Sequence, residues 1–161
     1  MAQVGQNGLG IDDALSVIFR AGSLLCALRL DEVIETMRPL PTRPLAGAPP
    51  FVPGICVLRG VPTPVVDVAR LLGGEEAEAT RFLAVRTDRG SVAFATGEVL
   101  AIREALPGGG ATGHAALLTG ASSRLVAGVG TIDDEPLLLL QSMRVVPDDV
   151  WAAAAGEAVP V

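Results

Sequence analysis

The sequence has no tyrosine and no lysine, and aromatic residues make up only 3% of it. All 12 basic residues are arginine, and 18 carboxylates outnumber them to give a net charge of −6. An acidic chain with few rings to stack on bases repels a phosphate backbone, so we expect no nucleic-acid binding. The scarcity of aromatic rings also means that the core must consist of aliphatic side chains.

Cysteine and histidine are equally scarce. Cys26 and Cys56 stand apart in apolar strings, without the spacing of metal ligands, and are expected to be buried thiols of a reducing cytoplasm. His114 has no companion base or acid nearby, so no catalytic role and no metal site are expected. The sequence shows neither an uninterrupted apolar run of 18 residues nor the pattern of a signal peptide, so neither membrane insertion nor secretion is predicted.

The 161 residues are half apolar, with a mean hydropathy of +0.49, which is ample for one folded domain. Short aliphatic stretches separated by turn residues predict hairpins over 15–30, 55–68, 82–95 and 125–140, with a further strand over 99–105. This spacing indicates an all-β fold with short helices, built as one barrel or a pair of barrels. We expect a flexible N-terminus (1–14), a domain (15–146) and a helical tail (147–161).

Proline and glycine mark the connections. Six prolines between Pro39 and Pro53 predict an extended segment, and Pro62 and Pro64 indicate an edge strand. One helical turn is expected over 67–72, ended by two glycines. Periodicity leaves 31–37 open between a short helix and a strand.

The remaining motifs are weak. Gly108, Gly110 and Gly113 match the dinucleotide fingerprint, but Pro107 precedes them and no strand-to-helix context surrounds them, so 107–123 is predicted to be a mobile loop. The acidic clusters at 75–78 and 133–135 are interpreted as solvated turns. A small ligand-binding or enzymatic barrel that uses 107–123 over a cavity remains an alternative.

The segment 50–68, PFVPGICVLRGVPTPVVDV, resembles the signature of the CheW family, the adaptors of bacterial chemosensory arrays. In that family a Phe-x-x-Gly segment leads into Asn-Leu-Arg-Gly and then Pro-Val-Val-Asp-Leu; Val57 stands here at the position of the Asn. Upstream, Val33-Ile34-Glu35 is similar to the family's Val-x-Glu motif. Downstream, 127–130 and 137–140 are similar to its closing strands, so the resemblance covers about 15–146.

This resemblance implies two packed five-stranded β-barrels, no enzymatic activity and no cofactor. The implied partners are the regulatory domain of a CheA-type histidine kinase and the cytoplasmic tip of a methyl-accepting chemoreceptor, which would recruit the protein to membrane-associated arrays. Arg59 takes the place of the family's receptor-facing arginine, and Val33, Glu35 and Gly54 fall near the same groove. An arginine in a tight turn offers a rigid fork of N–H donors to carboxylates or carbonyl groups of a receptor helix. A relative that has lost one of the two interfaces is a further alternative.

Overall fold

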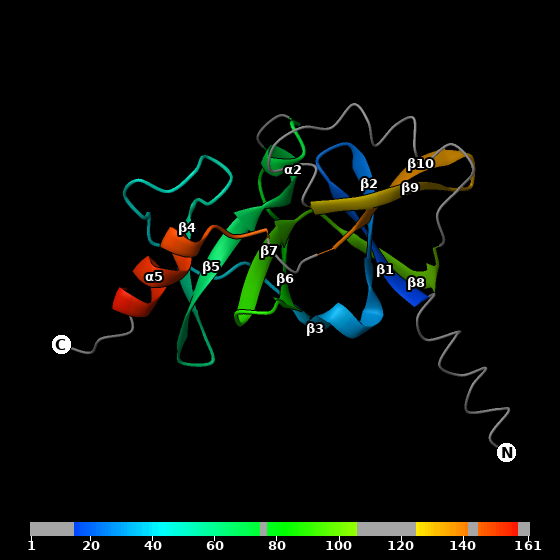
Figure 1. Cartoon of the computed structure of the whole chain (residues 1–161). Coiled ribbons are helices and arrows are strands. Elements are labelled where there is room, and N and C mark those ends of the chain that lie inside the picture. Colours follow the sequence, from blue (N-terminus) through cyan, green and yellow to red (C-terminus); the bar gives the residue numbers. More distant parts are fainter. Residues whose placement is uncertain (1–14, 75–76, 106–124, 142–144, 158–161) are drawn as a thin grey trace, which may run out of the picture.

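The computed structural model describes residues 15–74, 77–105, 125–141 and 145–157, and within them ten strands form two five-stranded sheets (Figure 1). Sheet A contains β1 (Leu15–Ala21), β2 (Leu24–Arg29), β8 (Val99–Glu104), β9 (Val126–Ile132) and β10 (Glu135–Leu140). Sheet B contains β3 (Val33–Met37), β4 (Gly54–Leu58), β5 (Val61–Asp67), β6 (Arg81–Arg86) and β7 (Ser91–Thr96). Three short helices complete the described part: η1 (Leu30–Glu32), α2 (Val68–Leu71) and α5 (Asp148–Glu157).

The two sheets share one pairing pattern, although each draws strands from both halves of the chain. The strand order is β8-β1-β2-β10-β9 in sheet A and β3-β6-β7-β5-β4 in sheet B. One pair in each sheet is parallel, β2 with β10 and β7 with β5, and the other pairs are antiparallel. The four hairpins expected from the sequence are confirmed. Each sheet forms because hairpins and single strands from both halves of the chain pair side by side.

The fold class is confirmed: the protein is all-β with short helices and two packed five-stranded units. The observed ladders do not close either sheet into a hydrogen-bonded barrel. Along the outer edge of β4 the proline-rich connection takes the place of a further strand, because Arg43 and Ile55 exchange N–H···O bonds of 2.8 and 2.9 Å. This bridge blunts one edge of sheet B.

Both faces of the central strands are buried, which gives three apolar layers. The layer shared by the two sheets, called here the inter-sheet cluster, includes the fully buried Phe19, Leu28, Leu83 and Phe94. The opposite faces bury separate clusters, with Ile18, Leu25 and Leu137 in sheet A and Cys56, Val65 and Phe82 in sheet B. Burial on both faces explains why these strands read as nearly continuous apolar runs.

The helical turn predicted over 67–72 is confirmed, and the segment 31–37 contains both of the elements that the sequence left open. Segment 31–37 contains the end of η1 and then β3. The Asp67 side chain caps α2 by accepting a 3.2 Å bond from the Arg70 N–H, and Gly73 follows with φ +83°. These match the helical turn and glycine stop expected over 67–72.

The expectation that two prolines mark an edge strand is wrong, because β5 lies between β4 and β7. The β5–β7 ladder covers only Val65 to Asp67, so Pro62 and Pro64 occupy the part of β5 that pairs with β4 alone. Proline, which lacks an N–H, is tolerated there.

Candidate interaction site

Arg59 lies at the tip of the hairpin that joins β4 and β5. The strands close at the pair Leu58 and Val61, which leaves Arg59 and Gly60 as a two-residue turn. Their φ angles are +51° and +80°, the mirror-image geometry that matches the twist of a two-residue hairpin. Positive φ is unfavourable for arginine, and such strain is held where the surrounding structure fixes it.

The guanidinium of Arg59 forms a bidentate ion pair with Glu35 on β3. Its Nε lies 2.7 Å from Oε2 and its Nη2 lies 2.8 Å from Oε1. The strands β3 and β4 are the two edges of sheet B, so this pair spans from one edge to the tip of the hairpin at the other. The Arg59 side chain remains 74% exposed, against 29% for Glu35. The contact therefore orients the guanidinium while leaving most of it accessible.

The same hydrogen bonds fix the charge states of both groups. They lower the pKa of Glu35 below its ordinary value and raise the pKa of Arg59, with the attraction between the opposite charges acting in the same direction. Both groups are therefore ionised at neutral pH. The Arg59 turn therefore presents a guanidinium cation directly beside the Glu35 carboxylate.

The other two residues that the resemblance singles out have different surroundings. Val33 lies on the same strand as Glu35 and is half-buried against the inter-sheet cluster, while its neighbour Ile34 is 43% exposed. Gly54 is buried at the opposite end of β4 from Arg59. A Cβ at Gly54 would stand 1.9 Å from the Arg43 carbonyl oxygen, so glycine is required there by the close approach of the connection.

Apolar side chains beside the turn were not singled out as a surface from the sequence. Val57 and Val61 are 62% and 59% exposed. Val57 also lines a cavity of about 420 Å³, together with Pro41, Thr42, Arg43, Ile55 and Pro62. A signal was present, because strict alternation from the buried Cys56 turns Val57 outward. We call this surface, Val57 and Val61 with the cavity, the hairpin patch.

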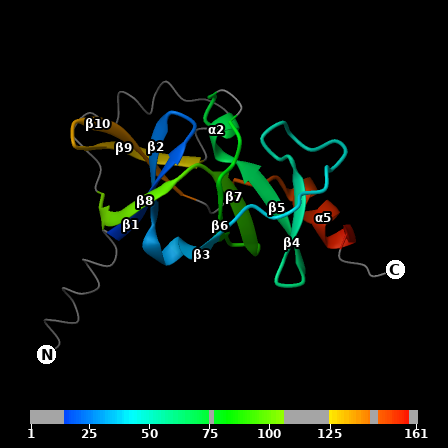
Figure 2. The same ribbon diagram turned by 180° about the vertical axis from the view of Figure 1, so that it is seen from behind.

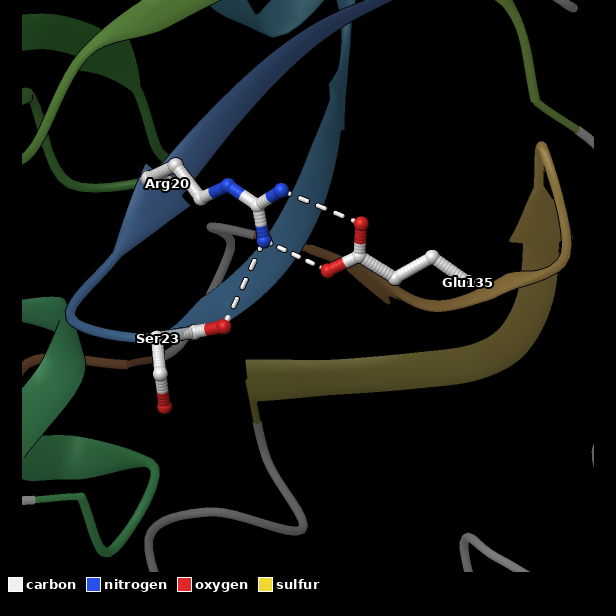
Figure 3. Close-up of polar contacts among 3 residues, drawn as sticks. All are labelled: Arg20, Ser23 and Glu135. Carbon is white, nitrogen blue, oxygen red and sulfur yellow. Dashed lines mark hydrogen bonds and ion pairs between the residues drawn. The ribbon is translucent and has the colours of Figure 1, made fainter.

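Ion pairs also lie in sheet A at the acidic turn 133–135, which is exposed to solvent, with the Asp133 side chain 81% exposed. Glu135 makes a bidentate contact with Arg20, whose Nη1 also donates to the Ser23 carbonyl (Figure 3). Asp133 lies 3.3 Å from the guanidinium of Arg103 on β8. The turn therefore holds two arginines from other strands. Nothing in the local sequence signals these pairs, because the partners are 115 and 30 residues away.

Both cysteines are buried free thiols, as expected. Burial raises the pKa of Cys26 to about 12 and also raises that of Cys56, so neither is a thiolate at neutral pH. In the part of the chain that the structure describes, no cluster of three His, Cys, Asp or Glu could hold a metal ion. His114, the glycines of 107–123, the N-terminus 1–14 and the acidic residues 75–76 lie outside the described residues.

A rigidly held guanidinium beside exposed apolar side chains is suited to binding another protein. The model of the CheW-like domain family matches residues 16–149, and the chain belongs to this family. The crystal structure of the scaffolding protein TtCheW from Thermoanaerobacter tengcongensis is similar, with a TM-score of 0.67 and 18% identity over 83% of this chain and 92% of that one. At this identity the likeness concerns the fold. No curated protein sequence matches the chain.

None of the described helices is long and apolar enough to cross a bilayer.

Proposed function

We propose that the protein is a noncatalytic adaptor that couples the cytoplasmic tip of a methyl-accepting chemoreceptor to the regulatory domain of a CheA-type histidine kinase. Membership in the CheW-like domain family supports this proposal. The observation that carries it is the Arg59–Glu35 pair, which presents an exposed and oriented guanidinium on a strained turn. The protein would act in the cytoplasm and be recruited to receptor arrays at the membrane.

For the receptor, the proposed contact is the Arg59 turn with the adjacent strand β3. An arginine side chain has several N–H donors, and Glu35 accepts hydrogen bonds from only two of the Arg59 nitrogens, Nε and Nη2. A receptor helix that carries carboxylates can accept the others. On the same strand as Glu35, Ile34 is 43% exposed and Val33 is partly exposed, so β3 also offers apolar surface.

For the kinase, the proposed contact is the hairpin patch. Val57 and Val61 are both exposed, Val57 lines a cavity, and a contiguous apolar surface of this kind can mark a protein interface. The two proposed contacts lie next to each other on the β4–β5 hairpin, so one molecule would hold the two partners side by side. Modest affinities would then be strengthened by the many contacts of an array.

The test measures binding of a purified receptor-tip fragment and of a purified kinase regulatory domain to the same set of variants. We expect Arg59→Glu to weaken receptor binding at least about tenfold, as for a central interface arginine, while Val57→Asp weakens kinase binding instead. Arg103→Glu is the matched control, because Arg103 is an exposed arginine in an ion pair of the other sheet.

Loss of receptor binding by Arg59→Glu alone supports the assignment. Equal behaviour of Arg59→Glu and Arg103→Glu contradicts it, since the effect would then follow net charge. Retention of one partner in the wild type and absence of the other identifies a relative with a single interface.

A further inference from the structure

The tip of the β4–β5 hairpin extends beyond the ladder that anchors it in sheet B. β5 pairs with β7 only over Val65 to Asp67, and the missing N–H of Pro64 is consistent with the end of that ladder. From Cys56 to Thr63 the hairpin is a two-stranded ribbon, and such ribbons are marginally stable in isolation. Figures 1 and 2 show the hairpin projecting past its neighbours. The ladder of sheet B therefore does not anchor the backbone of the Arg59 turn by itself.

Helix α5 lies beside this projecting hairpin in both views and packs against β5 (Figures 1 and 2). Val150 and Ala154 are buried one helical turn apart, and Trp151 is half-buried against the inter-sheet cluster. A cavity of about 300 Å³ is lined by Val61 and Pro62 of β5, by Trp151, Ala154 and Ala155 of α5, and by Arg89. The helix and the first residues of β5, which directly follow the Arg59 turn, therefore line one cavity.

The helix is itself fixed to a third element, the turn between β6 and β7. Arg89 in that turn forms an ion pair with Asp148 at 2.5 Å. Gly90 has φ +137°, and a Cβ there would stand 3.4 Å from the Trp151 ring. The ring therefore lies closely on the backbone of the turn. Trp151 therefore lies close to Gly90 in the β6–β7 turn and lines the same cavity as Val61 and Pro62 of β5.

We infer that α5, through Trp151, is a positioning element that holds the Arg59 turn in its binding orientation. This inference rests on the proposed function for its effect on receptor binding. The positioning itself is a property of the free protein. Trp151 would act through Arg59 and would not touch the partner.

The first experiment reads positioning without any partner. The carboxyl pKa of Glu35 is followed by NMR in the wild type, in Trp151→Ala and in Trp151→Phe, with Ala152→Ser as a control on the exposed face of α5. We expect Trp151→Ala to move the pKa of Glu35 toward its ordinary value because the ion pair becomes less populated. Trp151→Phe, which keeps a ring on Gly90, should restore it. An unchanged pKa in Trp151→Ala overturns the inference.

The second experiment is a double-mutant cycle between Trp151→Ala and Arg59→Ala, read as the Kd for the receptor-tip fragment. Trp151→Ala alone should weaken binding about threefold to tenfold, as expected when a side chain must be ordered on binding. In the Arg59→Ala background it should have no further effect. Additive losses overturn the inference, because Trp151 would then act independently of Arg59.

The two proposals fail in different ways. If Arg59→Ala leaves receptor binding unchanged while Trp151→Ala still moves the pKa of Glu35, the proposed function is wrong and the positioning stands. Trp151 is the one tryptophan in a chain without tyrosine, so its fluorescence shows whether α5 stays docked in each variant.

Discussion

Sheets A and B have the same strand pairing but present opposite charges at corresponding turns. The β4–β5 turn carries Arg59 and Gly60, and the β9–β10 turn carries Asp133 and Asp134. All four residues have positive φ, and the first residue of each turn forms an ion pair with the edge strand on the other side of its sheet. The shared strand order therefore brings the first residue of each turn close to the opposite edge strand. The charge of that residue then determines the charge of the partner with which it can pair.

The sheets also differ in how one edge is covered. In sheet B the connection before β4 bridges to Ile55 and passes close to Gly54, whereas in sheet A the described residues show no isolated bridge of this kind. Sheet B alone is backed by α5 at its hairpin. Within the described residues, the sheet with more external supports is the one that carries the proposed receptor site.

The largest effect is expected at this covered edge. Gly54→Ala would place a Cβ 1.9 Å from a backbone oxygen, and relieving that overlap should cost about 3 kcal/mol or more of unfolding free energy. Gly47→Ala is the matched control, since Gly47 also has positive φ, +80°, but has open space around its Cβ position. Denaturant unfolding of the two variants measures the difference. Equal losses would show that the connection does not constrain β4.

An exchange between the two turns should have a smaller effect. Asp134 and Gly60 both occupy the second position of a two-residue turn, at φ +66° and +80°. Replacing Asp134→Gly should stabilise the fold and Gly60→Asp should destabilise it, each by about 1 kcal/mol, because only glycine adopts this region without strain.

Asp134→Asn separates backbone conformation from charge, since it removes the charge but keeps a side chain. Thermal unfolding at neutral pH measures all three variants. If Asp134→Asn stabilises as much as Asp134→Gly, repulsion among the acidic residues of the turn is the cause, and the comparison of backbone strain fails.

The smallest effect concerns the two ion pairs with carboxylates of lowered pKa. Hydrogen bonds from Arg59 and Arg20 lower the pKa of Glu35 and Glu135 below the ordinary value of 4.5. A depressed pKa in the folded state contributes stability above that ordinary value and loses it as the pH falls through the folded value. The stability gap between the wild type and Glu35→Gln should therefore close as the pH falls below about 4.5.

The two pairs can be separated by NMR titration of the carboxyl groups. Arg59→Ala should return the pKa of Glu35 toward its ordinary value and leave that of Glu135 unchanged, and Arg20→Ala should do the reverse. A change at both carboxylates in either variant would mean that the two sheets are coupled electrostatically.

Much of the local structure could be predicted from the sequence, since turn residues and short aliphatic runs act over a few positions. The hairpin from Leu15 to Arg29, the capped turn after Asp67 and the helix that begins at Asp148 follow from such signals. The prediction that Pro62 and Pro64 mark an edge strand was wrong because a proline in a strand indicates only that one N–H is missing. It does not say which strand lies on that side.

The candidate site was predictable only in part. The motif around Arg59 and the position of Glu35 could be read from the chain, but their contact could not, because it joins residues 24 apart on two edges of one sheet. Two further features could not be predicted from the sequence. They are the close approach of the Arg43 carbonyl to Gly54 and the proposed positioning of Arg59 by Trp151, and each depends on atoms from distant segments.

The sequence by itself determined the all-β class, the positions of the hairpins, the aliphatic core and the family resemblance, because these depend on composition, short-range periodicity and a contiguous motif. Only the tertiary structure decided the exchange of strands between the two halves, the ion pairs at the turns and the place of α5 against β5. These depend on which buried faces meet. Aliphatic side chains of similar size do not encode their partners locally, so only the packed fold specifies them.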